Sequence, residues 1–394
     1  MTRKRLFTSD TLDAVAYIVL LLAVASWIAI LCVKQLTYGL EFDESYLLGV
    51  ANNLASGSGY VDDGVTFLST SEPFSPVIST GPTVLIPVSL TWWIFDGDLL
   101  AIRVTMLFFF GILLFSVWRL FGNLSGRWAS LAAVGGLALV PTVAPDLQNT
   151  SLMPGRVVGE LPALALLLLA GLLLSKHRYF WSGLCLGLML LSKLTFAIPA
   201  AALVATFFVF ELLNRHIGPW QFLLRNFCGV AAPLIAFELI KTVTLGPEGY
   251  VRHIDALRDF LGNQDIPWHQ LYIFIDEHLE GTLRLFSVPL LTVIVVMIAL
   301  TWRWTRLRMG SSQNRRDARD HATGWVIAAL SAGLAMMFLW WFFRSQQYSA
   351  RPALPTVLWL AIASCGVAFA IATQGRSRSD RISVALASTL YVVL

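Results

Sequence analysis

The stretch AVAYIVLLLAVASWIAILCV at residues 14–33 decides the class of fold. About 20 consecutive apolar residues are what an α-helix needs to cross a hydrocarbon layer of about 30 Å. The run is longer than the ~7–15-residue apolar core of a signal peptide. Arg3, Lys4 and Arg5 precede it, and positive charge stays on the cytoplasmic side of membrane helices. The stretch therefore predicts an uncleaved first membrane helix that starts in the cytoplasm.

The rest of the chain has the same apolar character. Hydrophobic residues make up 57% of the 394 residues and charged residues 13%, whereas soluble globular proteins carry about 25% charged residues. This composition excludes a soluble enzyme, a disordered chain and a fibrous rod. Further apolar stretches lie at 99–118, 129–145, 161–174, 179–192, 194–213, 227–243, 282–302, 324–343, 352–372 and 382–394. We expect an all-α polytopic membrane protein of about 11 transmembrane helices, a single domain over 1–394 without a soluble domain.

The apolar stretch 82–95 is ambiguous as a membrane-spanning segment. It is short, contains Pro82 and Pro87, and is followed by Asp96. If it does not cross, most of the 28 basic residues lie on the cytoplasmic side and most of the 24 acidic residues lie outside. If it crosses, all later basic loops move outside, against the positive-inside rule. We therefore expect a re-entrant or interfacial helix on the outer face.

This topology leaves four outer loops to form the active site, at 34–98, 146–160, 244–281 and 344–351. Two of them have the pattern of amphipathic juxtamembrane helices, because apolar residues recur at helical spacing. These residues are Leu47, Val50, Ala51 and Leu54 in the first loop and Tyr250, Ile254, Leu257 and Leu261 in the third.

Asp43 stands directly before the first of these amphipathic helices. One interpretation is a helix N-cap, since aspartate is among the preferred residues at that position. The other is a catalytic base at the boundary of water and membrane, because carboxylates at membrane depth are functional candidates by default. Spacing alone does not separate the two roles.

The segments FDESY at 42–46 and NLASGSGY at 53–60 resemble the first outer loop of the GT-C superfamily. These are integral-membrane glycosyltransferases that use polyprenyl-phosphate sugars. The chain is most similar to the protein O-mannosyltransferase and aminoarabinose-transferase branch, in which an Asp-Glu pair follows the first helix. Gly81-Pro82 resembles the proline-led short helix of that branch, and RVVGELP at 156–162 resembles its second outer motif. PALP at 352–355, after Tyr348, is similar to its late Arg-Tyr-x-x-Pro-x-x-Pro motif, so the resemblance spans 1–372.

The resemblance implies transfer of a sugar from a polyprenyl phosphate to an acceptor hydroxyl, with inversion, at the outer face of the inner or plasma membrane. Asp43 matches the catalytic base of the branch, Glu44 is its neighbour, and Glu160 matches the second acid. The implied partners are a polyprenyl-phosphate sugar, a lipid, glycan or protein acceptor, and the bilayer, with no nucleic acid.

The leaving phosphate of such a reaction needs fixed cations. The candidates on the outer side are Arg351, Arg344, Lys193 and Arg156, with Tyr348 beside the first two. Lys193 has an alternative role as a snorkelling residue in a turn. The late motif departs from the family pattern: Gln347 stands where the family has arginine, unless an inserted residue shifts the match onto Arg351.

The sequence leaves open whether the chain binds a metal and whether it has one of two alternative functions. Some branches of the superfamily use a divalent metal, but the pair Asp96 and Asp98 fits interfacial polarity better than a metal site, so we assign no metal ligands and leave a divalent metal possible. The alternative functions are a transporter or flippase for a lipid-linked sugar and a non-catalytic subunit of a membrane complex. A transporter needs ionisable residues near the bilayer midplane, and the chain offers chiefly Glu238 and Lys241, near one end of their helix.

Overall fold

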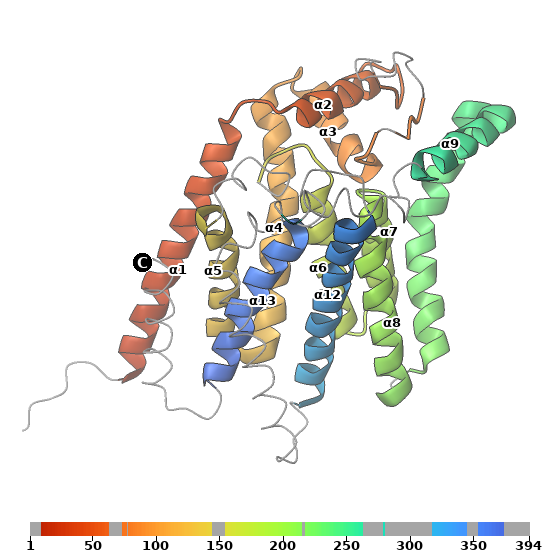
Figure 1. The fold of residues 1–394 in the computed structure, drawn as a ribbon. Coiled ribbons are helices and arrows are strands. Elements are labelled where there is room, and N and C mark those ends of the chain that lie inside the picture. The colour runs from red at the N-terminus through yellow and green to blue at the C-terminus, as the bar shows by residue number, and fades with distance from the viewer. Residues whose placement is uncertain are drawn as a thin grey trace, which may run out of the picture.

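The computed structural model describes residues 9–62, 73–76, 78–143, 154–214, 217–262, 279, 317–344 and 354–373. Within them the chain is a bundle of α-helices with α2 lying across one end (Figure 1). The helices are α1 (Ser9–Leu36), α2 (Phe42–Ala55), α3 (Pro82–Ile94), α4 (Leu99–Ser125), α5 (Arg127–Val143), α6 (Glu160–Ser175), α7 (Tyr179–Leu190), the 3-10 helix η2 (Leu194–Phe196), α8 (Ala197–Asn214), α9 (Pro219–Gly262), α12 (Asp317–Arg344) and α13 (Leu354–Thr373).

The predicted membrane segments that fall within the described residues are all helical, so the all-α class is confirmed. Five helical segments, in α1, α4, η2 with α8, α9 and α12, are long and apolar enough to cross a membrane, and α3, α6, α7 and α13 are shorter apolar helices. The predicted segments at 282–302 and 382–394 lie outside the described residues. Among the described residues, β structure is limited to one bridge between Val61 and Pro73.

Helix α6 forms the centre of the bundle. Nearly all its side chains are buried, because it packs against α4, α7 and α12. Its sequence ELPALALLLLAGLLLS is apolar on every face after the first residue, and a helix of this kind is stable only where it is surrounded. The burial of α6 brings its first residue, Glu160, into the protein interior.

One end of the bundle gathers the first loop of the chain. Helix α1 ends there and α4 begins there, with α2 and α3 between them (Figure 1); we call it the α2 end. Helix α3 has 13 residues, or about 20 Å of helix, which is short of a hydrocarbon layer of about 30 Å. A crossing by α3 would place the end of α1 and the start of α4 at opposite ends, so the arrangement agrees with a helix that does not cross.

Helix α2 begins earlier than the sequence predicted. It starts at Phe42, with Glu41 in the N-cap position, so the N-cap interpretation of Asp43 is wrong and Asp43 lies inside the first turn. The reason is Ser45, whose backbone N–H and hydroxyl both donate to the carbonyl of Glu41, at 2.8 and 2.9 Å. The expected apolar face is confirmed where α2 packs on α3. Its buried members are Leu47, Val50 and Ala51.

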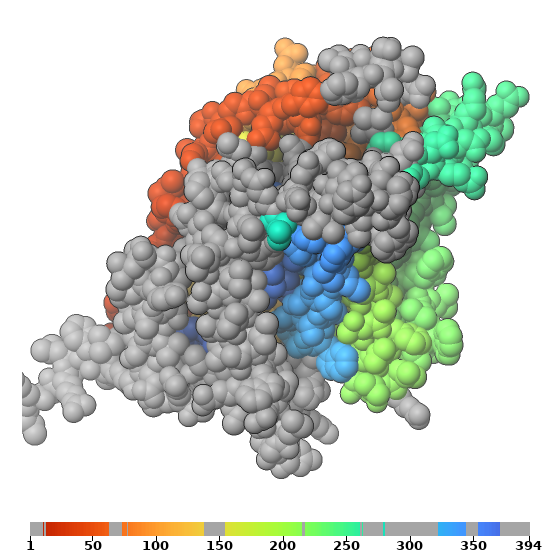
Figure 2. Space-filling model, in the orientation of Figure 1, coloured from red at the N-terminus to blue at the C-terminus, as the bar shows by residue number. Residues whose placement is uncertain are grey.

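Helix α9 is longer than the predicted segment 227–243, and it is kinked. The backbone leaves helical geometry at Gly246, with φ 68° and ψ 172°, a region that glycine adopts without steric cost, and Pro247 interrupts the hydrogen bonds that follow. The limb at 247–262 bends away from the bundle at the α2 end, where it forms the upper right corner of the molecule (Figure 2). The helix expected in the third outer loop is therefore present in this limb.

The opposite end of the bundle holds a second polar cluster. Glu211 is fully buried, accepts a hydrogen bond from the Tyr179 hydroxyl at 2.7 Å and lies 3.5 Å from Nδ1 of His177. The turn between α6 and α7 therefore meets the end of α8 there. Since Glu160 begins α6 at the other end, α6 and α8 run in the same direction and α7 runs in the opposite direction, packed against α6 and α9.

Candidate active site

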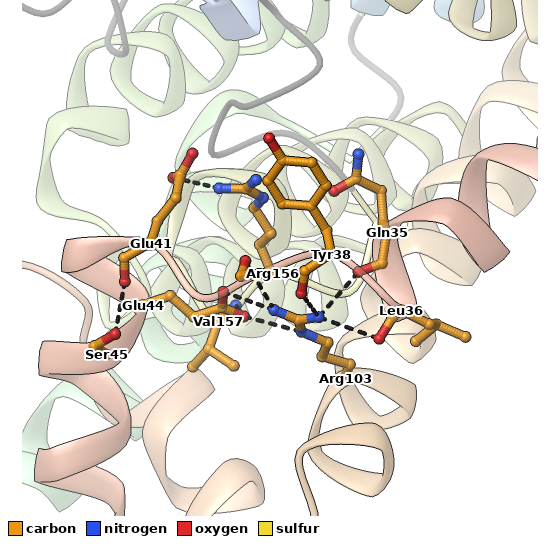
Figure 3. Close-up of polar contacts among 10 residues, drawn as sticks. Gln35, Leu36, Tyr38, Glu41, Glu44, Ser45, Arg103, Arg156 and Val157 are labelled. Carbon is orange, nitrogen blue, oxygen red and sulfur yellow. Dashed lines mark hydrogen bonds and ion pairs between the residues drawn. The ribbon is translucent and has the colours of Figure 1, made fainter.

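A buried ion pair joins the first loop to α4. Arg103 Nη2 lies 3.0 Å from Glu44 Oε2, and Nε donates to Oε1 at 3.3 Å; both side chains are 1% exposed (Figure 3). Two parallel contacts of this kind fix the relative orientation of a guanidinium and a carboxylate. Glu44, in the first turn of α2, is therefore held against α4.

The same arginine caps the end of α1. Its Nη1 donates to the carbonyl oxygens of Gln35, Leu36 and Tyr38 at 3.2, 3.1 and 2.5 Å (Figure 3). The last carbonyls of a helix have no partner within the helix, and a cation there also interacts favourably with the helix dipole. Arg103 thus connects the end of α1, the start of α2 and α4, and it determines how the chain turns between the first two helices.

A second buried arginine lies beside this junction. Arg156, in the segment that leads into α6, forms an ion pair with Glu41, and its guanidinium stands over the ring of Tyr38 at 5.3 Å from the ring centre (Figure 3). The Arg156 side chain is 2% exposed. The next backbone N–H, of Val157, donates to Glu44 Oε1 at 3.5 Å. The second outer motif therefore contacts the first outer loop at two carboxylates, Glu41 and Glu44.

Two predicted site residues form a third pair. Lys193 Nζ lies 3.1 Å from Glu160 Oε1, with the side chains 17% and 8% exposed. The same ammonium donates to the Ser79 hydroxyl at 3.3 Å. Lys193 is therefore a partner of Glu160 and Ser79, and its role in phosphate binding stays a prediction.

Close backbone contacts hold this pair in place. The Gly81 N–H donates to the Ser192 carbonyl at 3.1 Å, and the Ser192 hydroxyl donates to the Gly159 carbonyl at 2.9 Å. A Cβ atom on Gly81 would overlap the carbonyl of Leu191, and one on Gly159 would meet the carbonyl of Ser192 at 2.6 Å. Only glycine fits such approaches, so the starts of α3 and α6 and the turn after α7 form one closely packed unit.

An aromatic contact ties the first loop to α9. The Tyr60 hydroxyl donates to the Thr80 carbonyl at 3.1 Å, its ring stacks on Phe74 at 5.4 Å, and the edge of Phe237 meets both rings. Burial raises the pKa of the Tyr60 hydroxyl, so it remains a proton donor to Thr80. Lys241 Nζ lies over the Phe237 ring at 5.1 Å.

Lys241 also takes part in a contact across the kink of α9. It pairs with Glu238 at 2.6 Å and lies 3.3 Å from Nε2 of His253. The Tyr250 hydroxyl donates to the other Glu238 oxygen at 2.9 Å. Residues on both sides of Gly246 thus meet, and the two charges considered for a transporter lie at the α2 end of the bundle.

Asp43 and Glu44 are adjacent in sequence but differ in environment. Both are in the first turn of α2, where the helix dipole favours negative charge. Glu44 is buried against Arg103, whereas Asp43 is only partly buried. Of the two carboxylates, Asp43 is therefore the more exposed.

The late cations are described only in part. Arg344 is the last residue of α12, and the start of α13 packs beside the middle of α12, where the Thr356 hydroxyl donates to the Leu334 carbonyl at 2.7 Å. Arg351, Tyr348 and Gln347 lie outside the described residues. In the described part of the chain, no three His, Cys, Asp or Glu side chains converge as metal ligands. Asp98, from the acidic pair considered for a metal, accepts a hydrogen bond from the Ala101 N–H at 3.0 Å and caps α4.

Sequence reasoning missed Arg103, Glu41 and Tyr38. A signal for Arg103 was present, because it is the one charged residue in the apolar stretch 99–118, and an ionisable residue within a membrane segment is a functional candidate. Glu41 and Tyr38 carried no such signal, since polar and aromatic residues are common where a helix leaves the membrane.

Comparison with known proteins places this arrangement in a known fold. No family model and no curated protein sequence matches the chain. The crystal structure of ArnT from Cupriavidus metallidurans bound to undecaprenyl phosphate matches 96% of the chain with a TM-score of 0.59 and 13% sequence identity. Its apo state matches 98% with a TM-score of 0.55 and 14% identity. ArnT is an aminoarabinose transferase with the GT-C architecture.

The chain has the GT-C fold. The fold that the sequence motifs implied is thereby confirmed, and with its apolar helices it makes the chain an integral membrane protein. The chain spans 63% and 64% of the length of the two ArnT structures.

Proposed function

We propose that this chain is a glycosyltransferase that moves a sugar from a polyprenyl phosphate to an acceptor hydroxyl, with inversion at the anomeric carbon. The observation that carries the proposal is the α2 end itself: Arg156 and Lys193, each paired with a carboxylate, lie at the same end of the bundle as the partly buried Asp43, on a fold shared with a structure that holds undecaprenyl phosphate. We place this end at the outer face of the inner or plasma membrane, with the N-terminus in the cytoplasm, because the basic loops then lie inside.

Asp43 acts as the general base in this proposal. The acceptor hydroxyl gives its proton to the Asp43 carboxylate while its oxygen forms a bond to the anomeric carbon. The bond from that carbon to the phosphate oxygen breaks, and the polyprenyl phosphate leaves with the electron pair. Proton transfer to a positioned carboxylate contributes about 10²–10⁴-fold to rate.

The cations stabilise the charge that develops on the leaving phosphate. Arg156 is suited to this role because its planar guanidinium can donate to two phosphate oxygens at once. Lys193 is suited to it because its ammonium is held by Ser79 and by Glu160 at the start of α6. Arg344 and Arg351, with Tyr348, are proposed to complete the set from the late loop. A lipid, glycan or protein carries the acceptor hydroxyl.

Glu44 and Glu160 have supporting roles in this scheme. Glu44 is 1% exposed and fully engaged with Arg103, so we assign it the positioning of Asp43 through the start of α2. Glu160 holds Lys193 at 3.1 Å and thereby sets where its charge stands. Neither carboxylate needs to exchange a proton with the acceptor.

The alternatives receive less support from the geometry. A transporter needs charge near the middle of the membrane, yet Glu238 and Lys241 pair with each other and with the limb beyond the kink. A non-catalytic subunit gives no reason for the buried arginine pairs at the α2 end.

The proposal is tested by the lipid that the protein holds. Protein purified in mild detergent should carry a polyprenyl phosphate, or its sugar derivative, enriched over the bulk lipid in mass spectra. Added undecaprenyl phosphate should raise the melting temperature, since a ligand at about 100 times its Kd stabilises a protein by about 2.7 kcal/mol. Absence of both the lipid and the shift would refute a polyprenyl-phosphate donor.

A further inference from the structure

Arg156 leaves much of its hydrogen-bonding capacity unused. A guanidinium has five N–H donors, arranged to match two oxygens of a carboxylate or phosphate. Arg103 uses this capacity on Glu44 and on the carbonyls at the end of α1. Arg156 Nη1 is in ion-pair contact with Glu41, but among the described residues neither Nη1 nor Nη2 has a partner in hydrogen-bonding geometry.

These unused donors are deeply buried. The Arg156 side chain is 2% exposed, and buried donors without partners are rare in native proteins because they lose water without replacement. The fork is also fixed in place, since the Tyr38 ring lies 5.3 Å from its central carbon. A buried, oriented and incompletely used guanidinium indicates a site for an oxyanion with at least two oxygens.

Glu41, the partner of Arg156, is the more exposed member of the pair. Glu41 is 28% exposed and precedes α2, where its side chain makes no capping hydrogen bond. Its carboxylate can turn into water without breaking a helix contact, whereas Arg156 cannot leave the interior. In any exchange of partners at this pair, Glu41 is the group that moves.

We infer that Glu41 is an internal competitor for the donor phosphate: it neutralises Arg156 while the site is empty, and a phosphate oxygen takes its place when polyprenyl phosphate binds. The inference rests on the proposed function and adds a regulatory element to the same site. The ligand chemistry is a phosphate ester or free phosphate, bound through both Nη atoms of Arg156. No bond is made or broken in the exchange.

A tethered competitor has a measurable effect on affinity. Groups on a short tether act at an effective concentration in the millimolar range, so the Glu41 carboxylate opposes phosphate binding. Glu41→Gln removes the negative charge, so the positive charge of Arg156 has no counter-charge from residue 41 until the phosphate binds. This variant should therefore bind undecaprenyl phosphate about tenfold more tightly and show a larger rise in melting temperature on binding.

The test uses full-length protein in nanodiscs titrated with undecaprenyl phosphate, with inorganic phosphate as a separate arm. The variants are Glu41→Gln, Arg156→Gln and the double variant, and the matched control is Glu248→Gln, an exposed glutamate on the α9 limb. We expect tighter binding for Glu41→Gln, weaker binding for Arg156→Gln, and no further change when Glu41→Gln is added to Arg156→Gln. The control should bind like wild type.

The outcomes separate this inference from the proposed function. Wild-type binding of undecaprenyl phosphate with unchanged or weaker binding by Glu41→Gln overturns the exchange but leaves the lipid donor standing. No wild-type binding of either probe overturns both. If inorganic phosphate shows the Glu41 dependence and undecaprenyl phosphate does not bind, the exchange stands and the lipid donor falls. Should Glu41→Gln fail to fold, Glu41→Asp retracts the carboxylate by one methylene and should also tighten binding.

Discussion

Arg103 and Arg156 are both buried arginines that contact a glutamate of the first loop, yet their surroundings give them different roles. Arg103 is saturated: a carboxylate and several carbonyls take up its donors. Arg156 holds one carboxylate that is itself partly exposed. A buried ion pair whose donors are all used does not exchange partners readily, since removing one partner leaves the other charge buried and unpaired. An arginine with unused donors can accept a ligand. We therefore assign Arg103 to structure and Arg156 to binding.

The first prediction concerns the Arg103 pair. Arg103→Met leaves Glu44 charged and buried, so stability should fall by about 3–5 kcal/mol, seen as a lower melting temperature in detergent. Glu44→Leu added to Arg103→Met should recover much of the loss, because it removes the stranded charge. Arg258→Met, at an exposed position of the α9 limb, is the control and should melt like wild type. An Arg103→Met protein as stable as this control would show that the pair does not hold the loop.

At the scale of elements, apolar runs and turn residues predicted the helices well, but they did not predict the contacts between loops. Pro82 and Gly81 marked the start of α3, whereas the kink of α9 at Gly246 was seen only in the structure. The pairs of the site join residues far apart in sequence, 59 positions for Arg103 with Glu44 and 114 for Lys193 with Ser79. The periodicity of apolar residues shows only which residues share a face of one element, so it does not predict such long-range pairs.

The second prediction tests the unit formed by α3, α6 and the turn after α7. Gly81→Ala places a Cβ against the carbonyl of Leu191, and a backbone atom cannot rotate away. We expect a loss of about 1–3 kcal/mol, as for other overpacked sites, measured as a drop in melting temperature. Gly111→Ala, in α4, meets no atom within 4 Å and should be neutral or stabilising, since alanine favours a helix by about 1 kcal/mol. Equal melting of the two variants would contradict the close contact.

At the scale of the whole molecule, the direction of each helix decides which loops meet. Positive charge placed the starts of α2 and α6 on one side, and the pairs of Glu44 with Arg103 and Glu160 with Lys193 lie together at the α2 end. The Tyr179–Glu211 contact marks the other end. Sequence thus predicted that the starts of α2 and α6 lie at one end of the bundle, while the roles of Asp43, Glu44 and Glu160 stay predictions. The neutralising partners Arg103 and Glu41 emerged only from the packed structure.

The third prediction concerns the orientation of the bundle in the membrane. In a protein whose native cysteines are replaced, Asn52→Cys on α2 and Asn214→Cys at the end of α8 both present exposed thiols. An impermeant thiol reagent should label position 52 in intact cells, and position 214 only after the membrane is opened. Labelling with the reverse pattern would place the α2 end in the cytoplasm and remove the outer-face assignment.

The central claim is that Asp43 takes the acceptor proton during transfer from a polyprenyl-phosphate sugar. The most direct measurement is release of undecaprenyl phosphate by protein in proteoliposomes, from a panel of undecaprenyl-phosphate sugars with a cell-envelope extract as acceptor. Asn keeps the size of Asp but does not accept the proton, so Asp43→Asn should melt like wild type and lose about 10²-fold or more in rate, while Asp259→Asn, an exposed aspartate on the α9 limb, should keep it. Equal turnover per folded molecule of Asp43→Asn and wild type, or no transfer by wild type from any donor of the panel, would contradict the account.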